Sequence, residues 1–259
     1  KAHNQVYQTR SNRWFDLFNF LWSGFPALVR KHILYVLLSI VILGGSASVA
    51  YYFTIQDVHF AQMEIAKGHP IVSDEMWTMI EHHEMWTDPV EKYSAQFSSL
   101  IATNNIKVSI LAFVLGITFG VGTGYILLNN GLLLGTIFGV CRQYGMDQRL
   151  LAFVAPHGVL ELSAIFISGG AGLLIGKALL FPGQYKRLDA LKLATRDAGG
   201  LFGGCVPLLL IAGMIEGFIS PRTDLSAQSK FAISLATLAC LFLYIFVPRE
   251  KKSPDSAPN

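Results

Sequence analysis

Apolar runs follow one another along this chain, and most have the roughly 20 residues needed to cross a hydrocarbon layer about 30 Å thick. Charged residues make up only 14% of the 259 residues and are gathered mainly between the runs. An ordinary soluble domain carries about 25% charged residues. The sequence therefore predicts an all-α fold, a polytopic transmembrane helix bundle.

We expect six segments to be embedded in the membrane. They cover residues 33–54, 106–128, 131–145, 150–181, 199–220 and 230–248. The third segment is short for a full crossing. The fourth is long, and Gly169, Gly170 and Gly172 near its middle predict a kink or a break. The sequence Asn129–Asn130–Gly131 is typical of a turn between the second and third segments, with the asparagine amides capping the helix ends.

Lysine and arginine accumulate in cytoplasmic loops, so their positions predict which helix ends face the cytoplasm. Six crossings put three basic clusters on one side: Arg30 and Lys31; Lys177, Lys186, Arg187, Lys192 and Arg196; and Arg249, Lys251 and Lys252. A transmembrane domain of residues 33–248 then has a mainly acidic extracytoplasmic loop, 55–105, and a cytoplasmic loop, 182–198. Both termini, including the tail 249–259, are expected in the cytoplasm.

Three further segments predict helices outside the spans, and one of them is the polar intracellular stretch "YKRLDALKLATRDAGG" (185–200). Residues 1–32 form a cytoplasmic or interfacial amphipathic segment whose aromatic residues, from Trp14 to Phe25, recur at helical spacing. It either lies along the membrane interface or continues the first span as an aromatic anchor. Residues 73–86 begin with capping residues and place Trp77 on an apolar stripe, which predicts an extracytoplasmic amphipathic helix.

Glycines recur every four residues in four of the segments, a spacing that lets helix backbones approach closely in lipid. The repeats are Gly116, Gly120 and Gly124; Gly131, Gly135 and Gly139; Gly172 and Gly176; Gly199/Gly203, Gly200/Gly204 and Gly213/Gly217. We expect segments two to five to form one compact core, with the first and sixth at its edge. The glycine-rich faces also predict a homo-oligomer.

Ionisable side chains inside the apolar runs are the main candidates for function. A charge at mid-membrane costs about 2.5–3.5 kcal/mol on insertion scales and normally faces the protein interior. His157 and Glu161 lie one helical turn apart on one face of the fourth segment. Glu216 lies near the end of the fifth segment, and Asn104 and Asn105 open the second. The predicted topology puts all of them at a similar depth in the outer leaflet.

Four roles are open for His157, Glu161 and Glu216. They hold helices together through polar contacts, or they line an outward-facing cavity for a small solute, ion or proton. Alternatively, they coordinate a divalent metal such as Zn²⁺ or Mn²⁺, or one acts as general base in intramembrane hydrolysis. The sequence has no GxSxG, HExxH or GxxxxGK[ST] motif. We therefore assign no catalytic residue and no cofactor, and we expect no nucleic acid partner.

Three stretches resemble the stage II sporulation protein M family of integral membrane proteins. They are "NNIKVSILAFVLGITFGVGTGYILLNNGLLLG" (104–135), "PHGVLELSAIFISGGAGLLIG" (156–176) and "IAGMIEGFISP" (211–221). The resemblance implies a protein of the bacterial or archaeal cytoplasmic membrane. It implies partners among peptidoglycan-remodelling, AAA+ or von Willebrand-type proteins, or a role as a permease component. The motif positions carried over are His157, Glu161 and Glu216, with Asn104, Asn105 and Asn130 behind them.

Together these features predict a scaffold or component of an envelope-associated membrane complex, with a buried polar His/Glu site in the outer leaflet. The alternative is a transporter or permease subunit that binds a small solute, ion or proton at that site. An intramembrane metal-dependent hydrolase comes third. A tight, dry network around His157 would favour the scaffold, whereas a cavity that opens outward would favour transport.

Overall fold

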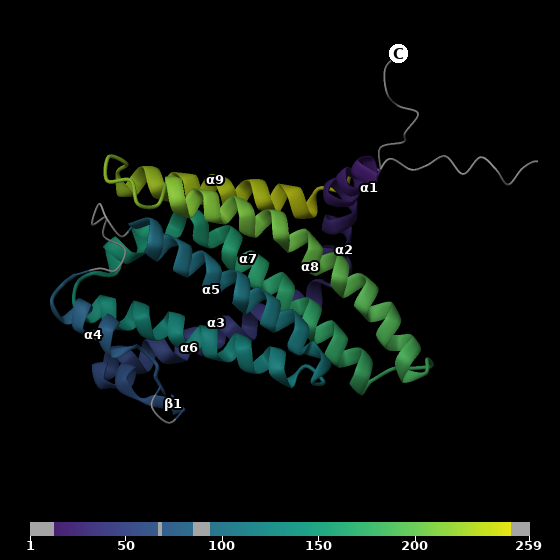
Figure 1. The fold of residues 1–259 in the computed structure, drawn as a ribbon, viewed down its shortest axis with the longest axis horizontal. Helices are drawn as coiled ribbons and strands as arrows, with labels where there is room; N and C mark the ends of the chain where they lie inside the picture. Colours follow the sequence, from purple (N-terminus) through teal and green to yellow (C-terminus); the bar gives the residue numbers. More distant parts are fainter. Residues whose placement is uncertain (1–12, 67–68, 85–93, 250–259) are drawn as a thin grey trace, which may run out of the picture.

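Long helices packed side by side form a bundle in the computed structural model, which describes residues 13–66, 69–84 and 94–249 (Figure 1). The first half of this part contains α1 (Arg13–Asn19), the π-helical turn η1 (Phe20–Gly24), α2 (Phe25–Lys31), α3 (Ile33–Gln56), η2 (Val58–Gln62), the antiparallel pair β1 (Glu64–Ala66) and β2 (His69–Pro70), and α4 (Asp74–Glu81). The second half contains α5 (Ser94–Val114), η3 (Leu115–Ile117), α6 (Val121–Gln143), α7 (Asp147–Leu180), α8 (Arg187–Phe218) and α9 (Ala227–Phe246).

The predicted all-α membrane bundle is confirmed. By length and hydropathy, α3, α6, α7, α8 and α9 can each cross a membrane, while the apolar part of α5 and η3, Thr103–Ile117, is shorter. The bundle has two ends, which we name by the short helices found there (Figure 1). The α4 end holds α4 and the turns between α6 and α7 and between α8 and α9. The α2 end holds α1, α2 and the turn between α7 and α8.

The predicted turn at Asn129–Gly131 is wrong. The chain reverses earlier, after η3, where Phe119 and Gly120 have positive φ angles of 57° and 81°. Glycine has no Cβ to disfavour this conformation. From there α6 runs unbroken through Asn130, whose Nδ2 donates to the Ile126 carbonyl at 2.9 Å. In an apolar setting a helix keeps its backbone hydrogen bonds, and this overrides the turn preference of the Asn-Asn-Gly sequence.

The predicted break in the fourth segment is also wrong, because α7 is one continuous helix through Gly169, Gly170 and Gly172. The glycines serve packing instead. A Cβ at Gly170 would lie 2.9 Å from the Val36 nitrogen of α3, and one at Gly172 would overlap the Ala112 carbonyl oxygen of α5. The polar helix predicted in the cytoplasmic segment 182–198 is present, because α8 begins at Arg187; it continues without a break into the apolar part of α8.

Glycine contacts bring α3 into the core, where the sequence had placed it at the edge. A Cβ at Gly135 of α6 would overlap the carbonyl oxygen of Ala47, and one at Gly139 would lie 2.7 Å from the Cβ of Thr54. As a result, α3 and α6 share the most extensive helix–helix contact in the described part of the chain. The expectation for α9 holds better: it lies along one edge of the bundle, and few of its side chains are buried (Figure 1).

The glycines of α8 divide between two faces. A Cβ at Gly204 would overlap the ring of Phe25, so this face packs against α2. By contrast, Gly199, Gly203, Gly213 and Gly217 have no such neighbour within 4 Å. Of the three glycine pairs predicted to pack the fifth segment, only Gly200/Gly204 therefore contributes to the described bundle.

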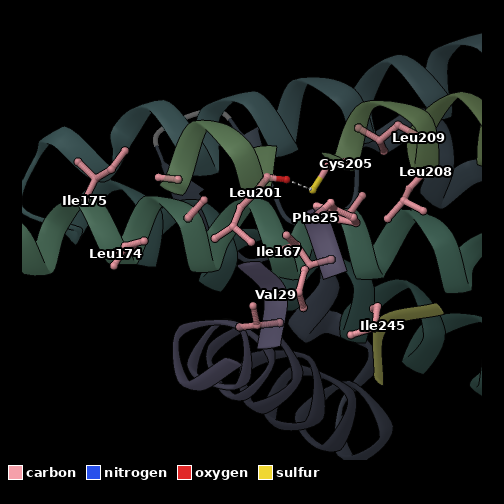
Figure 2. Close-up of a cluster of buried hydrophobic side chains, with 14 of the residues drawn as sticks. Phe25, Val29, Ile167, Leu174, Ile175, Leu201, Cys205, Leu208, Leu209 and Ile245 are labelled. Atoms are coloured by element: carbon pink, nitrogen blue, oxygen red, sulfur yellow. Dashed lines mark hydrogen bonds between the residues drawn. The ribbon is translucent and has the colours of Figure 1, made fainter. Parts of the chain in front are cut away.

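The described part of the N-terminal segment, from Arg13 to Lys31, is helical and docks on the bundle, while residues 1–12 of the predicted segment lie outside the described residues. Figure 2 shows Phe25 of α2 beside Leu201 and Cys205 of α8, and the Phe25 ring is fully buried. Lys31 and His32 both contact the Asp197 carboxylate, at 2.6 and 2.8 Å. A turn at His32 separates α2 from α3. The segment therefore does not continue the first span as one helix.

The helix predicted within residues 73–86 is present as α4. Its N-cap is Ser73, whose Oγ accepts a hydrogen bond from the Met76 N–H at 3.3 Å. Trp77 and Ile80 are buried in a cluster that includes Val140 of α6 and Leu150 of α7. The helix is thus fixed over the ends of α6 and α7.

Replacing Gly135 by alanine is expected to lower the free energy of unfolding by about 1–3 kcal/mol, the usual effect of overpacking. The added methyl group overlaps the α3 backbone, which cannot move aside as a flexible side chain would. The matched control is Gly124→Ala in the same helix, where nothing lies within 4 Å. Thermal unfolding followed by circular dichroism should show this control unchanged or stabilised, and equal destabilisation of both variants would contradict the packing.

Candidate functional site

A cavity of about 440 Å³ lies between α3, α5, α6 and α7 at the α4 end of the bundle, and α4 forms its roof. We call it the polar cavity. Most of its wall is apolar, with side chains such as Leu133, Ile137 and Phe153. Its polar lining residues are Ser73 and Glu75 from the roof, and Asn104, Asn105, Asn130, His157 and Glu161 from the wall.

Five of the six polar positions singled out in the sequence therefore line one cavity. Asn104 and Asn105 come from α5, Asn130 from α6, and His157 and Glu161 from α7. The continuity of α6 is what brings Asn130 here, since a turn at that residue would have placed it at the α2 end. Ser73, Glu75 and Asn104 are exposed, so the cavity meets the surface at the α4 end.

Glu161 is the acidic residue in this wall. Its side chain is almost completely buried, and its Oε2 accepts a hydrogen bond from Nδ2 of Asn105 at 2.5 Å. This contact joins α7 to α5. The Nε2 of His157 lies 3.8 Å from the same oxygen, which is too long for a hydrogen bond. Among the described residues, Asn105 is thus the hydrogen-bond donor to this oxygen of Glu161.

His157 faces the cavity on one side and the α8–α9 turn on the other. Its ring is 1% exposed, and its Nδ1 lies 2.8 Å from the Oγ of Ser220, within hydrogen-bonding distance. The Nζ of Lys230, from α9, donates to the Ser220 carbonyl at 2.7 Å. The chain of contacts from Lys230 through Ser220 to His157 ties three helices together.

Glu216, the sixth sequence candidate, lies outside the cavity lining. It is completely buried on α8, and within the described part of the chain neither of its carboxylate oxygens has a hydrogen-bond partner. Its helix α8 packs along α7, the helix that carries Glu161. The structure thus brings Glu216 near the site but behind its wall.

Sequence reasoning missed Ser220 and Lys230. Lys230 begins the last predicted segment, and a lysine at that place reads as a helix-end residue rather than a buried one. Ser220 precedes Pro221 and carries no signal of its own. Only the fold shows that Ser220 contacts His157 and that Lys230 contacts Ser220.

The geometry gives the metal-dependent roles little support. Within residues 13–66, 69–84 and 94–249, no three His, Cys, Asp or Glu side chains gather closely enough to hold a metal ion. His157 and Glu161 supply two donors, but protein zinc sites take three or four protein ligands. The arrangement is better suited to holding a solute by hydrogen bonds and charge.

Comparison with known proteins relates the chain to one family. The model of the family described as Stage II sporulation protein M matches residues 32–221. An uncharacterised protein of Methanocaldococcus jannaschii is 34% identical over 124 residues, covering 47% of this chain and 70% of that protein. No solved structure matches the chain. The matched region contains every polar residue of the cavity wall together with Glu216 and Ser220, while Lys230 lies beyond it.

Ser220→Ala is expected to lower the free energy of unfolding by about 1–3 kcal/mol, because it leaves a buried ring nitrogen of His157 without its partner. The matched control is Ser109→Ala. The hydroxyl of Ser109 is equally buried but has no hydrogen-bond partner among the described residues. Chemical denaturation of both variants in detergent checks this, and similar losses at the two serines would show that the His157 contact contributes nothing.

Proposed function

This chain belongs to the stage II sporulation protein M family of membrane proteins, and we propose that it binds a small polar solute in the polar cavity, as a transporter or permease subunit does. The observation that carries the proposal is the lining of this cavity. Polar side chains from α5, α6 and α7 line a space whose remaining walls are mostly apolar. The geometry therefore supports solute binding, the alternative role predicted from the sequence, more strongly than it supports the scaffold role.

The dimensions and chemistry of the cavity support binding. Its volume of about 440 Å³ falls within the range of about 300–1,000 Å³ typical of small-molecule sites. Such sites combine apolar walls with a few polar groups that fix the ligand's orientation. Polar residues within membrane helices are unfavourable unless they serve an interior site. Asn105, Asn130 and Glu161, from three different helices, all line this one cavity.

A scaffold role keeps one specific observation in its favour. The contacts from His157 through Ser220 to Lys230 hold α7, α8 and α9 together without touching a solute. On one side of His157, Glu161 and the asparagines line the cavity. On the other side, Ser220 and Lys230 make contacts between helices. The partners named by the resemblance, AAA+, von Willebrand-type or peptidoglycan-remodelling proteins, stay predictions, and so does the homo-oligomer.

We place the α4 end outside the cytoplasm, so that the polar cavity opens outward from the outer leaflet. This placement is supported by the basic residues at the other end. Arg30 and Lys31 lie at the C-terminus of α2, and Arg187 and Lys192 lie in the first turns of α8. Positive charge of this kind marks cytoplasmic helix ends. Both termini, and the tail 249–259, would then be cytoplasmic.

A thermal-unfolding screen of the purified chain tests solute binding. The panel contains alkylammonium ions, guanidinium, amino acids, polyols, sugars and carboxylates. A solute that fits the cavity stabilises the folded chain by about 2.7 kcal/mol at about one hundred times its Kd. In Glu161→Gln the midpoint should no longer respond, although Asn105 can still donate to the new amide oxygen.

Glu81→Gln is the matched control, since this acid lies on the exposed surface of α4 and does not line the cavity. It should respond as the unaltered chain does. If no member of the panel shifts the unaltered chain, or if Glu161→Gln responds as strongly as the control, binding in this cavity is excluded and the scaffold role remains.

A further inference from the structure

We infer that the ligand of the polar cavity is a small organic cation, such as a protonated amine or a guanidinium group, and that Glu161 is its counter-ion. This inference rests on the proposed function and adds the chemical class of the solute. It follows from the charges, the hydrogen-bonding groups and the aromatic side chains that line the cavity.

The charges of the lining are all of one sign. Glu75 stands at the mouth and Glu161 in the wall, and no lysine or arginine is among the lining residues. Two basic side chains at this end face other groups: Lys230 donates to the Ser220 carbonyl, and Arg142 pairs with Asp147 at 2.8 Å. A cleft with low-dielectric walls and charge of one sign concentrates ions of the opposite sign. The cavity therefore attracts cations and repels anions.

Glu216 strengthens this preference from behind the wall. Its fully buried carboxyl group accepts no hydrogen bond within the described part of the chain, and its helix α8 packs along α7, which carries Glu161. An ionised carboxylate buried without a partner is unfavourable, and a second one nearby adds repulsion. A cation held at Glu161 would reduce the repulsion between the two carboxylates. An anionic or neutral solute would not.

The remaining lining groups suit an organic cation. Asn105 and Asn130 each use an amide N–H on a protein acceptor, so their carbonyl oxygens are left to accept hydrogen bonds from a ligand. Phe138 and Phe153 also line the cavity, and aromatic rings attract ammonium and guanidinium groups. A carboxylate, amide oxygens and aromatic rings around one small space are a chemically complete set for an N–H-bearing cation.

A bare metal ion fits the same residues less well. The described chain has no cluster of three His, Cys, Asp or Glu side chains for it, and a cavity of about 440 Å³ is far larger than one ion. An organic cation fills more of the apolar wall. Its N–H groups also need only single hydrogen bonds rather than a full coordination shell.

Thiol modification measures the charge preference without knowledge of the natural ligand. Val154, which lines the cavity, is replaced by the smaller cysteine in a chain whose exposed Cys240 is changed to alanine. Three methanethiosulfonates are applied to membranes from the side of the α4 end: neutral hydroxyethyl, cationic trimethylammonium-ethyl and anionic sulfonatoethyl. Thr223→Cys, an exposed position at the same end of the bundle, gives the reference rates.

The cationic reagent is expected to react at Val154→Cys at least about tenfold faster than the anionic one, after normalisation to Thr223→Cys. Adding Glu161→Gln should bring this ratio toward one, and adding the control Glu81→Gln should leave it unchanged. Asn104→Cys at the cavity mouth gives a second reading should Val154→Cys fail to fold.

Two failures have different meanings. If the neutral reagent does not reach Val154→Cys or Asn104→Cys, the cavity is closed to water, and the proposed function fails together with the inference. If the neutral reagent reacts but the two charged reagents react at equal normalised rates, the cavity is accessible and only its preference for cations is overturned.

Discussion

Close backbone contact at glycine is the constraint on which the rest of this structure depends. In lipid, helices gain little from the hydrophobic effect on association, and packing at short distance takes its place. Gly116 of η3, the turn that directly follows α5, meets Gly172 of α7 in this way, and Gly135 of α6 meets Ala47 of α3. These contacts fix the positions of the helices. They therefore also fix the size of the space between the helices beyond the glycine contacts.

The polar cavity lies in that space. Asn105 precedes Gly116 by 11 residues, and Glu161 precedes Gly172 by the same 11 residues (116 − 105 and 172 − 161). Eleven residues are about three helical turns, or about 16 Å. The parallel helices α5 and α7 therefore touch through glycine at one level and through a hydrogen-bonded Asn–Glu pair at another. Close packing at the first level holds the polar pair at the second in register.

Much of the site could be predicted from the sequence, because costly polar residues in apolar runs are strong signals. The sequence shows His157 and Glu161 as a pair one helical turn apart. It also predicts that Asn104 and Asn105 lie at the same depth in the membrane as this pair. Other signals were ambiguous. The Asn129–Gly131 sequence favours a turn locally, but these residues are helical in the apolar setting of the bundle. The chain reverses at Gly120 instead. Glycine spacing shows that a helix can pack closely but not which neighbour it meets, so the place of α3 and the open face of α8 were unpredictable.

Chemical cross-linking in the membrane tests the central claim most directly, that α5 and α7 present Asn105 and Glu161 to each other. With both positions changed to cysteine, a short bis-methanethiosulfonate should join them within one chain. The control pair, Ile106→Cys with Glu161→Cys, uses a neighbouring exposed side chain and should remain unjoined. Cross-linking of the control pair alone, or of neither pair when both thiols react singly, would contradict the account.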